Sequence, residues 1–243
     1  MRRDDLQAQR ILVTHVRGFL GLPAARACAA AGAHVLCHDP SFVDAAARAA
    51  FKRDEPNLMP IAGQTPAALA SECGPLSCLI ANHDHPAIRA PFAPAATDEL
   101  QAALQALCVE PFALAAALVE GMRVRGGGKL IFVTSAAPLR GLAHYAPYVT
   151  ARGAANALAR TLAIELAPAN VKVLAFAPNF VASPTYFPDE LLADPAQRAR
   201  IEAHIPLGRL ATAEEAGTAL AFLASPAADF FTGSTLPYSG GWA

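Results

Sequence analysis

The sequence predicts an α/β fold in which one doubly wound, mostly parallel sheet carries helices on both faces. Apolar runs of strand length alternate with longer helical patterns, which is typical of βαβ units. Several of these runs are apolar on both faces, as buried parallel strands are. A chain of 243 residues, 54% hydrophobic and 16% charged, suits one large core. We therefore expect residues 1–243 to form a single domain.

The alternation of apolar patterns places the elements in order along the chain. Strands are expected at residues 10–14, 34–37, 58–61, 78–82, 129–134 and 171–176. Helices are expected at residues 24–31, 97–122 and 148–166. The last two helices are rich in alanine and leucine, and these small side chains suit a core and a subunit interface equally well.

Two loops rich in proline, residues 86–94 and 178–188, each follow a predicted strand. Ligands of open parallel sheets bind beyond the carboxyl ends of the strands. Both loops are therefore candidates to form a pocket.

Charge and composition exclude several classes of partner. The net charge is −1 and no long basic run is present, which argues against nucleic acid or an anionic membrane surface as a partner. Acidic residues at Asp4 and Asp5 interrupt any secretory signal, and we expect no window long enough to span a bilayer. A cytoplasmic protein is expected. The spacing of the five cysteines matches no zinc or redox motif, which predicts buried, reduced thiols.

The turn after the first strand departs from a nucleotide-binding turn. Such a turn needs glycines so that backbone amides approach a pyrophosphate at a helix N-terminus. In the pattern Thr-Gly-x-x-x-Gly-x-Gly the glycines fall at positions 15, 19 and 21, and only Gly21 is present. The side chains of His15 and Phe19 would enter the dinucleotide's space, so we expect NAD(P) binding to fail. The alternative is that Gly18 serves in a shifted register.

Three polar residues have spacing that suits catalysis. Ser135 ends a predicted strand, and Tyr148 and Arg152 lie four residues apart on one helix face. The alternative is an ordinary Tyr148–Arg152 pair on an alanine-rich helix.

The spacing of Ser135, Tyr148 and Arg152 resembles the serine, tyrosine and lysine of the short-chain dehydrogenase/reductase superfamily, with arginine in place of lysine. Together with Thr14, Phe19 and Gly21, the trio resembles the fingerprints of the halohydrin dehalogenase family. The resemblance covers nearly the whole chain. It implies a Rossmann-like, seven-stranded sheet, no cofactor or metal, and a homotetramer in which helices 97–122 and 148–166 pair across subunits.

The same resemblance implies a reaction. A vicinal haloalcohol closes to an epoxide with release of halide and a proton, and small anions such as cyanide, azide or nitrite open epoxides in reverse. Tyr148 would be the general base, although a free tyrosine has a pKa of about 10. A fixed cation lowers such a pKa by about 1–3 units, and arginine supplies the charge without losing its own proton. Ser135 would position the substrate oxygen, since His144 is not at a spacing that supports a nucleophilic serine.

The predicted halide and substrate pockets combine the first turn with the loops after later strands. The residues expected around the halide are Thr14, Phe19, Gly21, Pro178, Asn179, Phe180, Val181 and Phe187. Aromatic edges are electropositive and suit an anion, although Phe180 and Phe187 are also compatible with simple loop packing. The residues expected around the organic substrate are Ala136, Pro138 and Tyr186. Asp39, after the second strand, is interpreted as structural.

Two other functions remain compatible with the sequence. One is an NAD(P)-dependent oxidoreductase with an aberrant first turn, and the other is a non-catalytic scaffold protein. Turnover that requires NAD(P)H would support the first of these, and inactivity of an intact fold would support the second.

Overall fold

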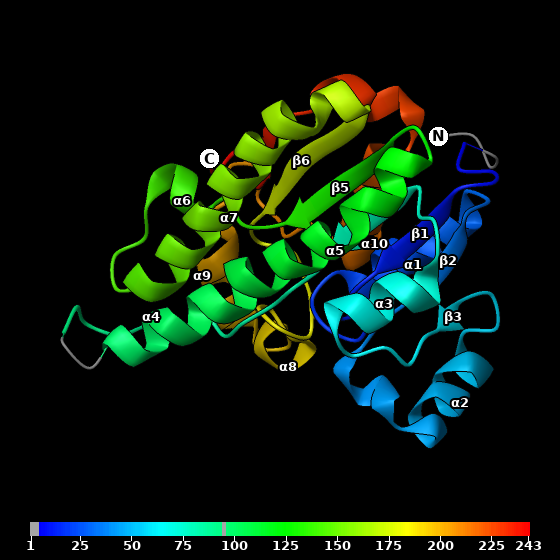
Figure 1. Cartoon of the computed structure of the whole chain (residues 1–243). Helices are drawn as coiled ribbons and strands as arrows, with labels where there is room; N and C mark the ends of the chain where they lie inside the picture. Colours follow the sequence, from blue (N-terminus) through cyan, green and yellow to red (C-terminus); the bar gives the residue numbers. More distant parts are fainter. Residues whose placement is uncertain (1–4, 94–95) are drawn as a thin grey trace.

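A computed structural model describes residues 5–93 and 96–243. Its centre is a sheet of seven parallel strands (Figure 1). The strands are β1 (Arg10–Val13), β2 (His34–Cys37), β3 (Met59–Pro60), β4 (Cys78–Ala81), β5 (Gly128–Val133), β6 (Val171–Pro178) and β7 (Thr235–Tyr238). Asp4 and Pro94, which entered the sequence predictions, lie outside the described residues.

The strand order is β3-β2-β1-β4-β5-β6-β7, and every neighbouring pair is parallel. The order reverses between β1 and β4, where the two halves of the sheet meet. The predicted doubly wound fold is confirmed, and the sheet is wholly parallel. The reversal creates a crevice at the carboxyl ends of the strands, which is the place where such folds bind ligands.

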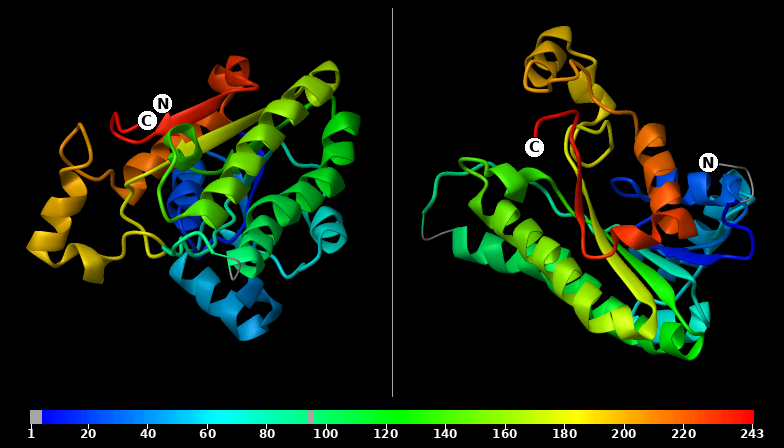
Figure 2. Two further views of the ribbon diagram at one scale, coloured as in Figure 1. Left: turned by 90° about the vertical axis from the view of Figure 1, so that its left-hand side faces the viewer. Right: turned by 90° about the horizontal axis from the view of Figure 1, so that it is seen from above.

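Helices cover both faces of this sheet (Figure 1). One face carries α1 (Gly21–Ala30) and α10 (Ala213–Ala224), and the other carries α3 (Pro66–Cys73), α5 (Glu110–Val124) and α7 (Ala146–Leu166). The remaining α-helices are α2 (Ala45–Asp54), α4 (Ala96–Leu104), α6 (Ala137–Arg140), α8 (Asp189–Leu192) and α9 (Pro195–Glu202). In both views of Figure 2 the segment with α8 and α9 stands away from the sheet.

Side chains of the central strands alternate between two cores. Ile11 and Val13 pack under α1 and α10, whereas Leu12 packs under α3, α5 and α7. This period of two is the geometry of an extended strand. Because both faces are covered, every residue of the central strand β4 is buried, which explains its continuous apolar sequence.

The observed elements differ from the predicted ranges mainly at their ends. β6 continues to Pro178, two residues past the prediction, and β3 keeps only Met59–Pro60 of the predicted residues 58–61. The predicted helix 97–122 contains a π-helical turn, Gln105–Val109, between α4 and α5. No range was predicted for β7, because the short run Thr235–Tyr238 contains a proline and is only partly buried.

The expectation that no segment is long enough to cross a bilayer is wrong. The helical stretch Ala96–Val124 has 29 residues and a mean hydropathy of 1.8 over its most apolar window. The stretch has the length and composition of a membrane-spanning helix because it contains few polar residues. Its buried side chains lie on one stripe facing the sheet and α7, which is how a core helix of an α/β domain packs.

The five cysteines are unpaired, and burial raises the pKa of the Cys37 thiol to about 12. Cys28, Cys37, Cys73 and Cys78 are buried as predicted. Cys108 is partly exposed, which corrects the prediction for that residue.

Gly21, the first residue of α1, is required by close packing. A Cβ at this position would lie 2.5 Å from the His15 carbonyl oxygen and 2.6 Å from Val16 Cα. Both neighbours are backbone atoms of the turn after β1, so they cannot rotate away. The glycine therefore permits α1 to begin directly against this turn.

We expect Gly21→Ala to lower the free energy of unfolding by about 1–3 kcal/mol, because the added methyl group overpacks a rigid turn. Denaturant unfolding measures this loss. Gly121→Ala in α5 is the matched control, since a Cβ there meets nothing within 4 Å. The control should be neutral or slightly stabilising. Equal stability of the Gly21→Ala variant would contradict the packing argument.

Candidate active site

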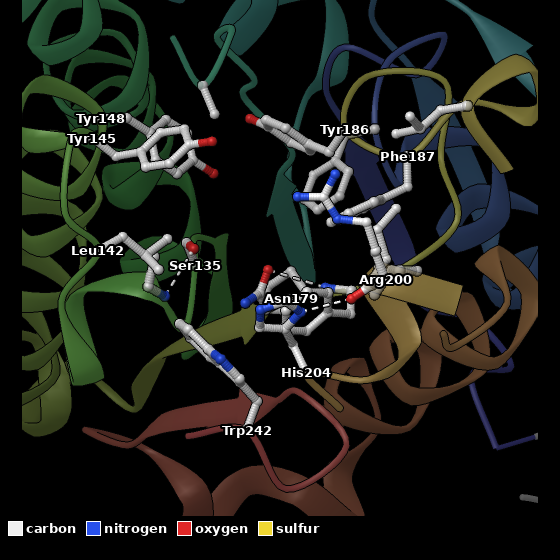
Figure 3. A pocket seen from close by; sticks show the side chains of 18 of the residues that line it. Ser135, Leu142, Tyr145, Tyr148, Asn179, Tyr186, Phe187, Arg200, His204 and Trp242 are labelled. Carbon is white, nitrogen blue, oxygen red and sulfur yellow. Dashed lines mark hydrogen bonds between the residues drawn. The ribbon is translucent and has the colours of Figure 1, made fainter. Parts of the chain in front are cut away.

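A cavity of about 540 Å³ opens at the carboxyl ends of the strands (Figure 3). Segments that follow β1, β4, β5, β6 and β7 all contribute to its wall, and α8 and α9 cover one side. Its lining is Phe19, Ala87, Ser135, Ala137, Leu142, Tyr145, Tyr148, Pro178, Asn179, Phe180, Val181, Tyr186, Phe187, Leu191, Gln197, Arg200, Ile201, His204 and Trp242.

The three predicted catalytic residues come together beside this cavity. Ser135 follows β5, and Tyr148 and Arg152 lie on successive turns of α7. Ser135 and Tyr148 line the cavity, whereas Arg152 is 1% exposed and lies behind the tyrosine. Arg152 Nε donates a hydrogen bond of 3.2 Å to the Tyr148 hydroxyl oxygen. A buried guanidinium therefore supports the phenol that faces the cavity.

Arg152 uses its other donors to join separate parts of the sheet. Nη1 donates to the Val133 carbonyl at the end of β5 and to the His83 carbonyl after β4. Nη2 donates to the Tyr186 hydroxyl at 2.8 Å. The flat guanidinium thus meets four acceptors on four chain segments, and only arginine carries enough donors in a fixed plane to do so.

The two tyrosines that Arg152 contacts differ in their surroundings. Burial raises the pKa of Tyr186 well above its ordinary value, although the charge of Arg152 opposes this. The Tyr186 hydroxyl also donates to the His85 carbonyl at 3.0 Å, which keeps its proton engaged. Burial tends to lower the pKa of Arg152, but the charges of tyrosinates at 148 and 186 outweigh it and raise that pKa. Tyr186 stays neutral and Arg152 stays charged at neutral pH.

Ser135 is held with its hydroxyl proton available. Its Oγ accepts a 3.1 Å hydrogen bond from the Ala137 N–H at the start of α6. Because this bond occupies a lone pair, the hydroxyl is left to donate into the cavity. His144, the histidine weighed as a base for Ser135, does not line the cavity, and its carbonyl accepts from Ala90 N–H.

Aromatic rings line the cavity opposite α7 (Figure 3). Phe180 lies 5.7 Å from Phe187 and 5.6 Å from Trp242 between ring centroids, and Phe19 meets Tyr186 edge-on at 4.7 Å. Asn179 Oδ1 accepts from Phe180 N–H. Since its oxygen is occupied in this way, the Asn179 amide has N–H donors to offer a ligand.

Four residues predicted to line the pockets lie outside the cavity wall. Thr14 is fully buried, and its Oγ1 accepts from Asn82 N–H, which joins β1 to β4. Gly21 packs against the first turn. Ala136 is buried where its N–H donates to the Pro178 carbonyl, and Pro138 faces Gly153 of α7. These four residues do not touch the cavity. Each packs or bonds between segments that carry lining residues, and so helps to hold those segments in place.

Several lining residues were not predicted. Trp242 lies near the chain end and reaches the cavity because β7 is adjacent to β6. Arg200 and His204 come from α9 and its end, and their spacing of four residues is the signal that would have placed both on one helix face. Tyr145 precedes Tyr148 by three residues and has the same signal.

The first turn keeps the backbone of a glycine turn without its glycines. His15 has a φ of 45° and Phe19 a φ of 38°, both in the left-handed region that favours glycine. These are the positions at which the nucleotide-binding pattern requires glycine. Gly18 has no such φ, and its Cα lies against Asp84, since an added Cβ would be 2.4 Å from Asp84 Oδ2. The register is therefore that of the pattern, and the shifted alternative is wrong.

Backbone amides that could hold a phosphate are already bonded within the protein. Phe19 N–H donates to Thr185 Oγ1 and Leu20 N–H donates to Asn82 Oδ1. The remaining N–H groups from residues 16 to 21 donate to the His38 carbonyl, Asp39 Oδ2, the His15 carbonyl and the Gly18 carbonyl. A pyrophosphate binds such a turn through free amides, and none of the N–H groups of residues 16–21 is free.

Charge also opposes a dinucleotide at this turn. Asp84 lies against Gly18 and accepts from Thr185 Oγ1 at 2.8 Å, so a carboxylate borders the position of a pyrophosphate. Asp39 accepts from Ser41 and from Arg17 N–H, which fits its structural interpretation. With Phe19 in the cavity wall, the residues present do not fit NAD(P).

Comparisons with known proteins identify the family of the chain. The family profile described as "Enoyl-(Acyl carrier protein) reductase" matches residues 19–243. The chain is 35% identical over 128 residues to dehydrogenase/reductase SDR family member 4 of Bos taurus, covering 53% of this chain and 45% of that one. It is 34% identical over 121 residues to a tropinone reductase homologue of Arabidopsis thaliana, covering 50% and 43%. The chain thus spans about half the length of the curated relatives it matches.

Two solved structures are similar along nearly the whole chain. One, described as "Dehalogenation enzyme", has a TM-score of 0.94 and 41% identity, covering 98% of this chain and 99% of that one. The other is "Halohydrin dehalogenase (HheC) bound to ethyl (2S)-oxiran-2-ylacetate", with a TM-score of 0.90, 36% identity and coverage of 95% and 96%.

Proposed function

Since the chain belongs to the short-chain dehydrogenase/reductase superfamily, within the family described as enoyl-(acyl carrier protein) reductase, we propose that it is a halohydrin dehalogenase that needs no nucleotide. It converts vicinal haloalcohols to epoxides and opens epoxides with small anions. The observation that carries this proposal is the buried Arg152–Tyr148 hydrogen bond at a cavity whose neighbouring dinucleotide turn is closed. The likeness to two dehalogenase structures supports it.

The reaction begins with proton transfer to Tyr148. The phenolate, which Arg152 Nε stabilises, accepts the proton of the substrate hydroxyl. The alkoxide oxygen then attacks the neighbouring carbon, whose bond to the halogen breaks so that halide leaves with the electron pair. Ser135 donates its hydroxyl to the substrate oxygen and holds it in line for this displacement. In reverse, an anion attacks an epoxide carbon and Tyr148 returns the proton.

The leaving halide binds among the aromatic rings opposite α7. Phe19, Phe180 and Phe187 line this part of the cavity, and aromatic ring edges are electropositive, while the Asn179 amide supplies N–H donors. Apolar walls exclude competing water, which strengthens each weak contact with the anion. Asn179 provides a hydrogen bond that aromatic carbon cannot.

Halide release from 1,3-dichloro-2-propanol with no nucleotide present tests the proposal directly. We expect turnover of the unaltered protein and a loss of at least about 10²–10⁴-fold in kcat for Tyr148→Phe, which removes the base. Tyr186→Phe is the matched control, because Tyr186 lines the same cavity and contacts the same arginine but stays neutral. Its loss should be about tenfold or less.

Two results would contradict the proposal. Turnover that appears only when NAD(P)H is supplied would identify an oxidoreductase. Absence of halide release by a folded protein, with a range of small haloalcohols, would leave the scaffold alternative.

Arg152→Lys tests how the phenolate is stabilised. Lysine keeps a charge but cannot reach all four acceptors of Arg152 in one plane. With weaker support, the phenolate that must accept the substrate proton is less stable, so kcat/KM should fall. Initial rates of halide release by the folded variant check this. An unchanged kcat/KM in Arg152→Lys would show that the guanidinium geometry does not matter to the base.

We also propose a homotetramer in which the helical stretch Ala96–Val124 and α7 pair across subunits. Apolar side chains on these two segments are exposed in the single chain: Val109 is 48% exposed, Phe112 51% and Ile164 77%. Burial of such side chains stabilises association. Light scattering should give four chains per particle, and Ile164→Glu should reduce this mass. A monomeric mass for the unaltered protein would overturn the proposal.

A further inference from the structure

Two histidines, His15 in the first turn and His83 after β4, each have a buried ring nitrogen that bonds to nothing described in the structure. His15 Nδ1 and His83 Nδ1 have no hydrogen-bond partner, and both rings belong to a cluster in which His15 and His83 lie 4.4 Å apart between centroids. A buried polar atom without a partner costs free energy, so such atoms call for a ligand or an ordered water.

A carboxylate completes this cluster. Glu110 is exposed at the start of α5, and its carboxylate and one nitrogen of each ring lie within 4.8 Å of one another. Zinc binds imidazole nitrogen and carboxylate oxygen at about 2.0–2.2 Å, so ligand atoms lie up to about 4 Å apart around one ion. The exposed Glu110 side chain can rotate to close the remaining gap. The set of two histidines and one glutamate leaves a coordination position for water.

We propose that His15, His83 and Glu110 bind a divalent transition-metal ion such as Zn²⁺, in the crevice where the superfamily's dinucleotide turn is closed. Three elements meet there: the turn after β1, the segment after β4 and the first turn of α5. This site is separate from the cavity that Ser135 and Tyr148 line.

The protonation state of the rings suits a metal. Burial lowers the pKa of His15 and of His83, and the neighbouring His38 ring, 5.6 Å from His15, has its pKa lowered to about 4 for the same reason. The rings are therefore neutral at pH 7, the form in which histidine ligates.

The charges around the cluster balance a dication. Asp39, Asp84 and Glu110 act on His15 as negative charges, and Arg152, whose Nη1 bonds the His83 carbonyl, is the positive charge that acts on His83. Three carboxylates offset the guanidinium and the ion together. Without the ion, the three negative charges of the carboxylates outnumber the one positive charge of the guanidinium, so the electrostatic potential at His15 favours a cation.

The backbone positions the ligands in unusual ways. His15 occupies a left-handed position that favours glycine. Glu110 directly follows the π-helical turn Gln105–Val109, which changes the face of the helix on which the carboxylate lies. Single π-helical turns are frequent at functional sites.

Equilibrium dialysis of tag-free protein against Zn²⁺, with Co²⁺ absorption as a report of coordination, tests the site. We expect one ion per chain. Glu110→Gln should weaken binding about tenfold or more, and His15→Gly, which keeps the left-handed turn, about a hundredfold. Glu120→Gln, an exposed change on the same helix, is the control and should bind as the unaltered protein does.

Circular dichroism verifies that each variant is folded. Absence of saturable one-to-one binding would overturn the proposal, and buried water would then account for the ring nitrogens. Affinity that survives either Glu110→Gln or His15→Gly, or that Glu120→Gln alone reduces, would also overturn it. None of these readouts depends on dehalogenase activity.

Discussion

The site depends on one buried cation, Arg152, four of whose five N–H donors bond within the protein. Arg152 is 1% exposed and bonds a phenol on its own helix, a second phenol in the loop after β6, and the carbonyls that follow β4 and end β5. A buried charge is tolerated only where hydrogen bonds replace its lost hydration. The same bonds that compensate Arg152 therefore fix the distance between α7 and the carboxyl ends of the sheet. The cavity takes its shape from this arrangement.

This constraint explains why arginine stands where the superfamily has lysine. A lysine has three donors on a flexible stem, and in the superfamily it also contacts the nicotinamide ribose. In a chain whose residues do not fit a dinucleotide, the side chain at this position has no ribose to contact. The loop after β6 then needs another support. Arg152 provides it through Tyr186, which in turn bonds the His85 carbonyl after β4. One side chain thus donates to the Tyr148 hydroxyl at the cavity and supports the loop after β6.

The sequence was sufficient where local rules decide the structure. The apolar runs located β1, β2, β4 and β5 almost to the residue, since buried parallel strands leave a strong signal. Spacing was also sufficient to bring Tyr148 beside Arg152. It was insufficient for Trp242 and α9, which reach the cavity through contacts between distant segments. The sequence also placed Thr14 and Ala136 in the pocket wall, whereas the structure has both outside the cavity lining. The position of a residue at the end of a strand does not reveal whether its side chain points into the cavity.

At the closed first turn, more than bulky side chains makes the residues a poor fit for a dinucleotide. Replacing His15 and Phe19 by glycine would clear space, yet the amides of Phe19 and Leu20 would still donate to Thr185 and Asn82. A phosphate would have to break these bonds and approach the carboxylate of Asp84. Breaking satisfied buried bonds and adding repulsion both raise the free energy of the complex. The misfit therefore has three physical causes, namely steric bulk, occupied donors and charge, and reopening the turn would require changes in the segments after β1, β4 and β6 together.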